Sequence, residues 1–223
     1  MVFAPHPDDE ALGCSGTLLQ ILKKDVSSSI IFLTNGERLY GDPSYEIAQK
    51  RKEEAMMSSV MLGFKERLFL DFPDGEIDRH KGHIFGKLAE IIEQRNPDII
   101  LSPSPIDYHA DHLATSRIAM RLLNDFQTFR LAFYEVYSTL RFNYLVDITD
   151  VADLKRKTIL NYRTSLYGKP EIYAHAALGL NAQRSIFVQK EGFYEAFYVL
   201  ERPLELESIY DYLLYKDFPV RLY

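Results

Sequence analysis

The chain has 223 residues, 47% of them hydrophobic and 26% charged, a composition typical of a globular protein with a sizeable core. Its net charge is −6 and no basic stripe is present, which argues against nucleic acid as a main partner. One cysteine excludes an intrachain disulfide, and no apolar run reaches the roughly 20 residues of a membrane span. We expect a cytoplasmic protein without a membrane span and, because no linker divides the chain, a single domain over residues 1–223.

Short apolar runs alternate with helical patterns through the first two-thirds of the chain. Buried strands are predicted at residues 2–4, 29–34, 68–72 and 98–102. Helices are predicted from the first acidic cluster to about Lys24, and over residues 48–62, 83–95 and 113–123. This order predicts an α/β fold with a mostly parallel sheet flanked by helices on both faces.

The C-terminal third is expected to be richer in strands, because β-like runs cover residues 131–137, 144–148 and 193–200. In open α/β sheets, ligands bind beyond the carboxyl ends of the strands. The loops that follow the first four strands should therefore face one crevice.

Two of those loops are rich in histidine and carboxylate side chains. The first reads Pro5-His6-Pro7-Asp8-Asp9-Glu10, and the second reads Asp107-Tyr108-His109-Ala110-Asp111-His112. Parallel strands would bring both loops to the same end of the sheet, although about a hundred positions separate them in sequence. Their convergence predicts a metal site.

Three side chains form the expected ligand set: His6, Asp9 and His112. Pro7 favours an extended His6, and successive helical residues point about 100° apart, so that His6 and Asp9 can share an ion while Asp8 stays beside it. Two histidines and one carboxylate with an open position are typical of catalytic zinc, although Fe²⁺ accepts the same ligands.

The remaining polar groups of the two loops suggest a hydrolytic mechanism. Asp8 would be the general base and then the proton donor to the leaving amine. His109 would stabilise an oxyanion, with Asp111 fixing its charge or tautomer. A helix-capping role is the alternative for the first cluster, but three acids exceed what a cap requires.

These two segments resemble the LmbE-like, or PIG-L, deacetylase family, whose members carry Pro-His-Pro-Asp-Asp-Glu and a later His-x-Asp-His. The similarity continues through Thr34-Asn35-Gly36-Glu37, Arg51-x-x-Glu54, Leu62-Gly63, Phe72-Pro73-Asp74-Gly75, Asp147-Ile148-Thr149 and Glu195-Ala196-Phe197. The resemblance implies a Rossmann-like fold, Zn²⁺ and deacetylation of N-acetylglucosamine compounds. It implies the same ligands, base and oxyanion partner as above.

Substrate contacts are expected from Arg51, Asp74 and Tyr108. Arg51 is implied by the resemblance alone, because its surroundings in sequence read as a solvated helix face. Asp74 lies in a turn, where a plain turn residue is the alternative. Tyr108 stands where the family usually has Gly, and would narrow the pocket.

Other reactive side chains are assigned structural roles. His80 and His83 have helical ligand spacing, but no acidic or cysteine partners cluster usefully with them for a second metal site. His175 is expected to be a surface or satisfied histidine, and Cys14 a small packing residue.

The leading hypothesis is a zinc-dependent N-deacetylase of a small N-acyl sugar or glycoside, with a homo-oligomer left open. An amidase acting on a larger sugar conjugate, a non-catalytic metal- or sugar-binding module and an Fe²⁺ oxygenase are the alternatives. Asp8 beside a full ligand set speaks against pure binding, which needs no base.

Overall fold

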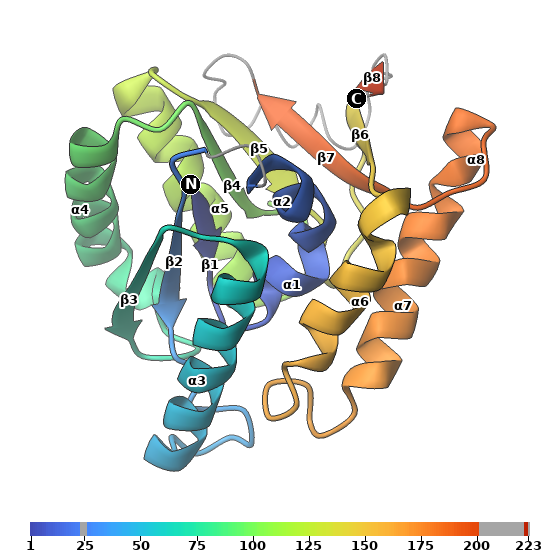
Figure 1. Ribbon diagram of the computed structural model, residues 1–223. Coiled ribbons are helices and arrows are strands. Elements are labelled where there is room, and N and C mark those ends of the chain that lie inside the picture. The colour runs from blue at the N-terminus through green and yellow to red at the C-terminus, as the bar shows by residue number, and fades with distance from the viewer. Residues whose placement is uncertain (23–25, 201–220, 223) are drawn as a thin grey trace.

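The computed structural model describes residues 1–22, 26–200 and 221–222, and shows one mixed sheet in the strand order β3-β2-β1-β4-β5-β7-β6-β8 (Figure 1). Strands β1 to β5 pair in parallel, β7 pairs antiparallel with β5 and β6, and β8 pairs in parallel with β6. The strands are β1 Val2–Ala4, β2 Ser29–Thr34, β3 Glu66–Phe72, β4 Ile99–Pro103, β5 Arg130–Tyr134, β6 Tyr144–Asp147, β7 Tyr194–Leu200 and β8 Arg221–Leu222.

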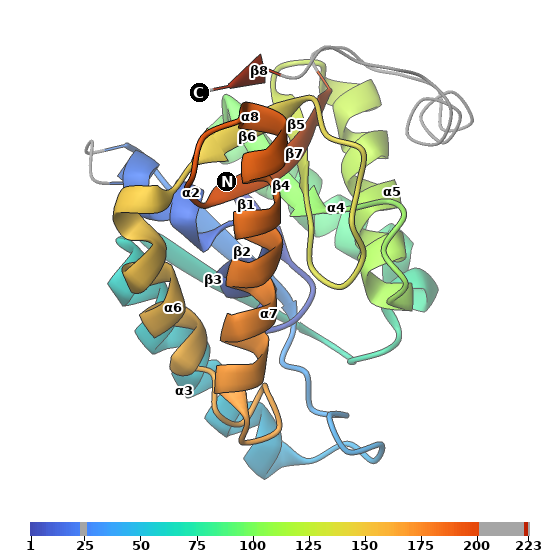
Figure 2. The ribbon, with the colours of Figure 1, turned by 90° about the vertical axis from the view of Figure 1, so that its right-hand side faces the viewer.

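Helices cover both faces of this sheet, as the alternating pattern predicted. Helices α4 and α5 pack together on one face, and α1, α2, α3, α6 and α7 lie on the other (Figures 1 and 2). The helices are α1 Asp9–Gly13, α2 Ser15–Ile21, α3 Tyr45–Leu62, α4 Ile77–Arg95, α5 Ala110–Phe126, α6 Ala152–Leu160 after the 3₁₀ turn Thr149–Val151, α7 Pro170–Gln183 and α8 Ser185–Val188.

Alternation along the central strands builds the two halves of the core. In β2, Ile30 and Phe32 belong to the cluster beneath α1, α2 and α3, whereas Ile31 and Leu33 belong to the cluster beneath α4 and α5. Both sets are fully buried because successive side chains of a strand point to opposite faces. The uninterrupted apolar runs that predicted buried strands are explained by helices on both sides.

The first predicted helix is interrupted. It divides into α1 and α2 at Cys14, whose backbone leaves the helical region at φ −143° and ψ 10°. The expected end near Lys24 lies outside the described residues. Helix α3 ends as predicted, with Gly63 in the left-handed conformation at φ 86°.

The strands of the C-terminal third lie where the sequence placed them, but three helices between β6 and β7 were not predicted: α6, α7 and the short α8. Helix α6 follows β6, and α7 begins at Pro170, in the first turn, where its missing N–H costs nothing. This third is therefore mixed rather than mainly strand.

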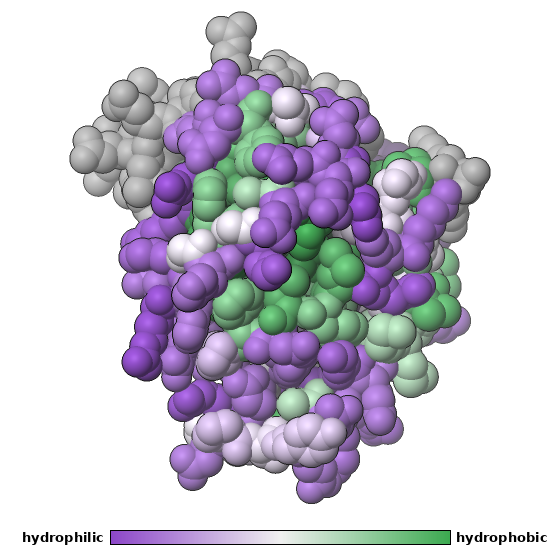
Figure 3. Space-filling view, turned by 90° about the vertical axis from the view of Figure 1, so that its left-hand side faces the viewer, coloured by the Kyte–Doolittle hydropathy of each residue, from purple (hydrophilic) through white to green (hydrophobic). Residues whose placement is uncertain are grey.

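The β3 edge of the sheet is partly open to solvent. Six of the seven β3 residues are half-buried, and on the side that carries β3 and α4 hydrophobic side chains gather inside a hydrophilic surround (Figure 3). None of the helices that the structure describes is long and apolar enough to span a membrane.

Candidate metal centre and active-site pocket

The loop after β1 is held to the neighbouring strand and carries a strained residue. Thr34 donates to the Pro5 carbonyl oxygen from its backbone N (3.0 Å) and its Oγ1 (2.9 Å). Asp8 then adopts φ 126°, a conformation that costs a non-glycine residue about 1–3 kcal/mol. Such strain persists only where surrounding contacts enforce it, which is common at functional sites.

The loop after β4 supplies the second group of ligands from the start of α5. His109 is the N-cap of α5, and its Nδ1 accepts the backbone N–H of Asp111 at 3.2 Å. His112, in the first turn, is completely buried and points towards the β1 loop. β1 and β4 are adjacent although not consecutive, so the two loops meet at the topological switch point of the sheet.

Asp9 contacts both candidate histidine ligands. Its Oδ2 lies 3.3 Å from Nδ1 of His6, and its Oδ1 lies 3.1 Å from Nε2 of His112. Two ligand atoms of one tetrahedral zinc ion are about 3.3 Å apart, given metal–ligand bonds of roughly 2.0–2.1 Å. The observed spacings fit that geometry.

Orphaned polar atoms at the same place also fit a cation. Oδ1 of Asp9 and both ring nitrogens of His112 are buried. Carboxylate oxygens lie 3.1–3.2 Å from the two nitrogens, but none of the three atoms makes a well-directed hydrogen bond. Buried polar atoms without partners are costly, and a metal ion would satisfy the two that face each other.

Further carboxylates orient the two imidazoles from behind. Oδ1 of Asp107 lies 3.2 Å from Nδ1 of His112. Nε2 of His6 lies 3.2 Å from Oδ2 of Asp111 and 3.0 Å from Oδ1 of Asp74. A proton on each of these outer nitrogens leaves the other ring nitrogen with a lone pair available to a cation bound beside Asp9.

The neighbouring carboxylate and imidazole groups shift each other's pKa values in the directions that favour their charged forms. Burial alone would lower the pKa of His112, but the charge of Asp9 and contacts with Asp107 and Asp9 raise it to about 9. Burial likewise opposes, and the two histidines reverse, the shift at Asp9, whose pKa is lowered well below its usual range. The surplus of carboxylates that produces these shifts would also stabilise a divalent cation.

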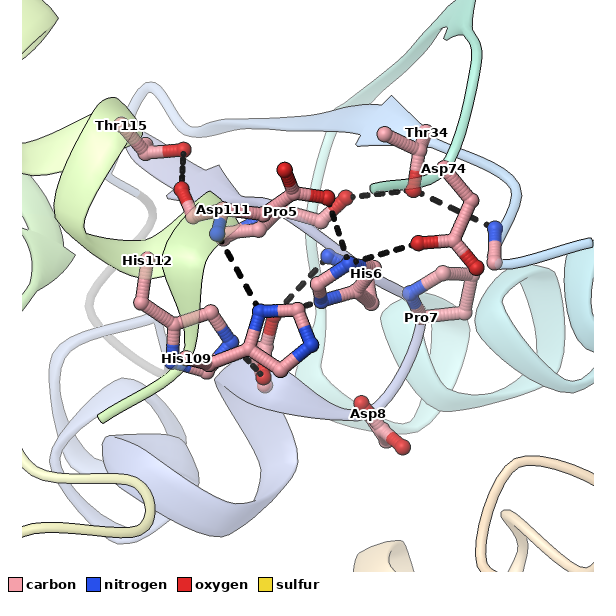
Figure 4. Close-up of polar contacts among 12 residues, drawn as sticks. Pro5, His6, Pro7, Asp8, Thr34, Asp74, His109, Asp111, His112 and Thr115 are labelled. Atoms are coloured by element: carbon pink, nitrogen blue, oxygen red, sulfur yellow. Dashed lines mark hydrogen bonds and ion pairs between the residues drawn. The ribbon is translucent and has the colours of Figure 1, made fainter. Parts of the chain in front are cut away.

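A third imidazole borders the same centre. Ligand atoms of His6, His109 and His112 all lie within 4.8 Å of one another, and Figure 4 shows the three rings gathered beside α5 with Asp8 below them. Nδ1 of His109 is already an acceptor, and burial followed by the two other histidines lowers its pKa. His109 is therefore a neutral imidazole with its proton on Nε2, a hydrogen-bond donor.

Asp8 and Arg51 lie together in the wall of a pocket of about 370 Å³. Burial, and then the charges of Asp9 and Glu10, raise the pKa of Asp8 well above its usual range, against the opposing charge of Arg51. Arg51 is 4% exposed, so the expectation of a solvated helix face is wrong. Its guanidinium donates to Ser165 Oγ, the Gly36 carbonyl and the Pro7 carbonyl, at 3.0, 2.9 and 2.9 Å.

Asp111 contacts His109 in a different way from the one expected, through its main chain and not through its carboxylate. The carboxylate of Asp111 does not fix His109; it contacts His6 and accepts the backbone N–H groups of Gly75 (2.8 Å) and Ile77 (3.2 Å). Only the Asp111 main chain donates to His109, because the Asp111 carboxylate is engaged by His6 and by the backbone N–H groups after β3.

Several pocket residues were not singled out in the sequence. Asp107, behind His112, was within the second motif but was given no role, and the pocket is lined in addition by Arg38, Leu39, Tyr137, Ser165, Tyr167 and Tyr173. Asp74 and Tyr108 do line it, whereas His80, His83 and His175 do not. Glu10 is turned away from the pocket and accepts hydrogen bonds from Ser58 and Tyr162 (2.8 and 2.5 Å).

Fold and site together define an α/β protein with a buried two-histidine, one-carboxylate centre at the carboxyl end of its sheet. Residues 1–123, more than half of the 223, match the model of the PIG-L family, described as GlcNAc-PI de-N-acetylase. The chain belongs to this family, as its two motifs indicated.

Relatives and solved structures agree with this placement. The chain is similar to diacetylchitobiose deacetylase of Thermococcus kodakarensis, with 28% identity over 72% of this chain and 67% of that protein. It resembles the conserved protein TT1542 from Thermus thermophilus, with 28% identity, a TM-score of 0.76 and coverage of 92% and 94%. The 4-carboxy-2-hydroxymuconate hydratase GalB of Pseudomonas putida shares the fold alone, with 21% identity, a TM-score of 0.76 and coverage of 92% and 96%.

Proposed function

We propose that this protein is a zinc-dependent hydrolase that removes the N-acetyl group from a small N-acetylglucosaminyl compound. The observation that carries the proposal is the contact of Asp9 with both His6 and His112, beside an Asp8 that lines the pocket and binds neither histidine. The deacetylase relative and the family description support the reaction, and the donor set supports zinc.

His6, Asp9 and His112 would hold the ion, with Asp74, Asp107 and Asp111 fixing the two imidazoles. Zn²⁺ in such a site polarises a carbonyl and lowers the pKa of water to about 7. Nδ1 of His6 and Nε2 of His112 are the ring atoms that would face it.

Asp8 is the proposed proton carrier. The pKa of Asp8 is raised, so it lies closer to neutral pH than that of an ordinary aspartate. This suits a group that accepts a proton from water and then gives it to the leaving amine. Arg51 lies 3.4 Å from Oδ2 of Asp8 and keeps that oxygen in place. Because all three guanidinium nitrogens are engaged, we propose that Arg51 positions Asp8 in addition to bordering the substrate.

His109 is the proposed oxyanion partner. Its Nδ1 accepts from the main chain, so the neutral ring presents Nε2–H as a donor to the developing negative charge. Removing one such donor typically costs about 10²–10³ in kcat.

We also propose that residues 1–123 and the remainder form one domain, because β1 to β4 share a single sheet with β5, β7 and β6. The loop between α6 and α7 supplies Ser165 and Tyr167 to the pocket, so the site draws on both parts.

The test is amine release from N,N′-diacetylchitobiose and N-acetylglucosamine by the wild type, Asp8→Ala and the exposed control Asp42→Ala, with zinc content measured in each. We expect Asp8→Ala to keep zinc and lose activity, while Asp42→Ala resembles the wild type. Zinc-loaded Asp8→Ala with wild-type activity would refute the base assignment. A panel of longer acyl groups tests the amidase alternative, which predicts that bulky acyl chains are preferred to acetyl.

A further inference from the structure

Three tyrosines that line the pocket, Tyr108, Tyr137 and Tyr167, take part in two aromatic pairs, and Tyr40 completes the second pair from outside the lining. Tyr108 and Tyr137 make an edge contact with ring centres 5.7 Å apart and planes at 64°. Tyr40 and Tyr167 make another at 5.7 Å and 80°. All four are 43–76% exposed, and we call these four residues the aromatic clamp. Exposed aromatic rings that are fixed in pairs beside a pocket are typical of recognition surfaces.

The two pairs come from four different loops. Tyr108 and Tyr137 follow β4 and β5, Tyr40 lies between β2 and α3, and Tyr167 lies between α6 and α7. The loops before α3 and between α6 and α7 extend at the same end of the molecule in both views (Figures 1 and 2). One pair continues to the metal centre, because the Tyr137 ring stacks on His112 with centres 5.6 Å apart.

Tyr167 is held in the clamp against its backbone preference. Its φ of 55° lies in the left-handed region, which is an outlier for a bulky residue, and its hydroxyl donates to the Leu39 carbonyl at 3.3 Å. Packing of the ring against Tyr40 is the other contact that fixes it. Backbone strain at a solvent-exposed aromatic residue points to a role in binding.

The charges around the pocket disfavour an anionic group next to these rings. The two arginines that line the pocket are both engaged: Arg38 pairs with Glu76 at 3.0 Å, and Arg51 is bonded through all of its guanidinium nitrogens. Asp74 adds negative charge to the same walls. A carboxylate or phosphate here would face the Asp74 carboxylate and would find both guanidinium groups already paired.

We propose that the aromatic clamp holds a second, uncharged sugar ring, so that the preferred substrate is an N-acetylglucosaminide with a neutral sugar as its aglycone. Sugar rings have apolar C–H faces that pack against aromatic rings, while their hydroxyl groups remain hydrated. Tyr108, Tyr137 and Tyr167 line the pocket and would contact the ring, and Tyr40 would support Tyr167. This inference rests on the proposed function and adds the identity of the group beyond the reacting sugar.

The experiment compares kcat/KM for N,N′-diacetylchitobiose, N-acetylglucosamine and N-acetylglucosaminyl malate. We expect the zinc-loaded wild type to favour the disaccharide over both others. Tyr108→Ala and Tyr167→Ala should each reduce the ratio of disaccharide to monosaccharide activity about five- to tenfold, the size of one aromatic contact. Tyr108→Phe should retain the ratio, and so should Tyr45→Ala, an 81% exposed tyrosine outside the pocket. Unchanged ratios in both Ala variants, or preference for the malate compound, would overturn the clamp.

Two further measurements separate this inference from the proposed reaction. Calorimetric binding of chitobiose does not require turnover: binding that weakens in Tyr108→Ala and Tyr167→Ala supports the clamp even if no acetyl group is removed, and equal or absent binding in all proteins overturns it. Tyr167→Asn relieves the left-handed backbone strain, so its thermal midpoint should not fall although its disaccharide preference does. A fall in thermal midpoint with the preference retained would assign Tyr167 a structural role instead.

Discussion

Oδ1 of Asp107 lies 3.2 Å from Nδ1 of His112, on the side of the imidazole opposite Nε2, which faces Asp9. The same carboxylate group accepts the backbone N–H groups of His109 (3.0 Å) and Tyr137 (3.1 Å). Asp107 therefore fixes a proposed ligand, the proposed oxyanion partner and one tyrosine of the aromatic clamp relative to one another.

Replacing Asp107 with Asn should weaken zinc binding about 10- to 100-fold, the usual effect of losing a carboxylate behind a ligand histidine. The neutral amide no longer stabilises a proton on Nδ1 of His112, so Nε2 becomes a poorer donor. Competition with a chromogenic chelator measures the affinity, and Asp125→Asn, at the exposed end of α5, is the control. Equal zinc affinity in both variants would show that Asp107 does not orient the His112 imidazole for metal binding.

Asp8 offers a comparison of two substitutions that both remove the carboxylate. Glycine tolerates φ 126°, whereas alanine does not, so Asp8→Gly should be about 1–3 kcal/mol more stable than Asp8→Ala. This reverses the usual order, in which alanine is about 0.4–1 kcal/mol more stabilising than glycine because it lowers the conformational entropy of the unfolded chain. Urea unfolding of both variants measures the difference, and a more stable Ala variant would mean that the backbone relaxes without cost.

Gly36 is expected to tolerate no side chain. Its φ is 62°, and a Cβ atom there would lie 2.1 Å from Nη1 of Arg51, so that Gly36→Ala must displace the guanidinium that contacts Asp8. We expect a loss of stability above about 1 kcal/mol together with reduced deacetylation.

Gly82→Ala provides the matched control. Gly82 lies inside α4, and a Cβ atom added there meets nothing within 4 Å. Helix propensity then predicts a gain of about 0.5–1 kcal/mol with activity unchanged. Thermal unfolding and amine release distinguish the two positions, and destabilisation of similar size in both would contradict the argument for Gly36.

Local sequence patterns were sufficient to predict the positions of the strands and the meeting of the two histidine- and carboxylate-rich motifs. Continuous apolar runs and turn residues located β1, β2 and β4 within about one residue. Strands that are covered by helices on both faces need apolar side chains on both sides, so they stand out in the sequence as short continuous apolar runs. The two motifs met because parallel strands open their loops on the same edge. Helices α6 and α7 were missed because their buried residues form no continuous apolar stripe: α7 buries only Pro170, Ala174 and Asn181.

Contacts between loops that are distant in the chain could not be predicted from the sequence. Arg51 looks solvated beside Lys50 and Lys52, and its burial depends on acceptors in three distant loops. The partner of Asp111 was misjudged for a related reason: spacing places Asp111 near His109, but the approach of the β1 loop brings His6 to its carboxylate. Proximity along the chain indicates candidates, and only the packing of loops selects the partner.

The last prediction concerns a buried ion pair that does not line the pocket. Lys155 on α6 and Glu195 on β7 are both fully buried with Nζ and Oε1 2.7 Å apart, and Glu195 also accepts the backbone N–H groups of Gly16 and Thr17. Lys155→Met leaves a buried carboxylate without its cation, which typically costs about 3–5 kcal/mol. The double variant Lys155→Met/Glu195→Gln should lose less, because the amide carries no charge and its oxygen can still accept from α2. Urea unfolding measures both against Lys157→Met, an exposed lysine on the same helix. A single variant as stable as the Lys157 control would show that the two backbone donors alone satisfy Glu195.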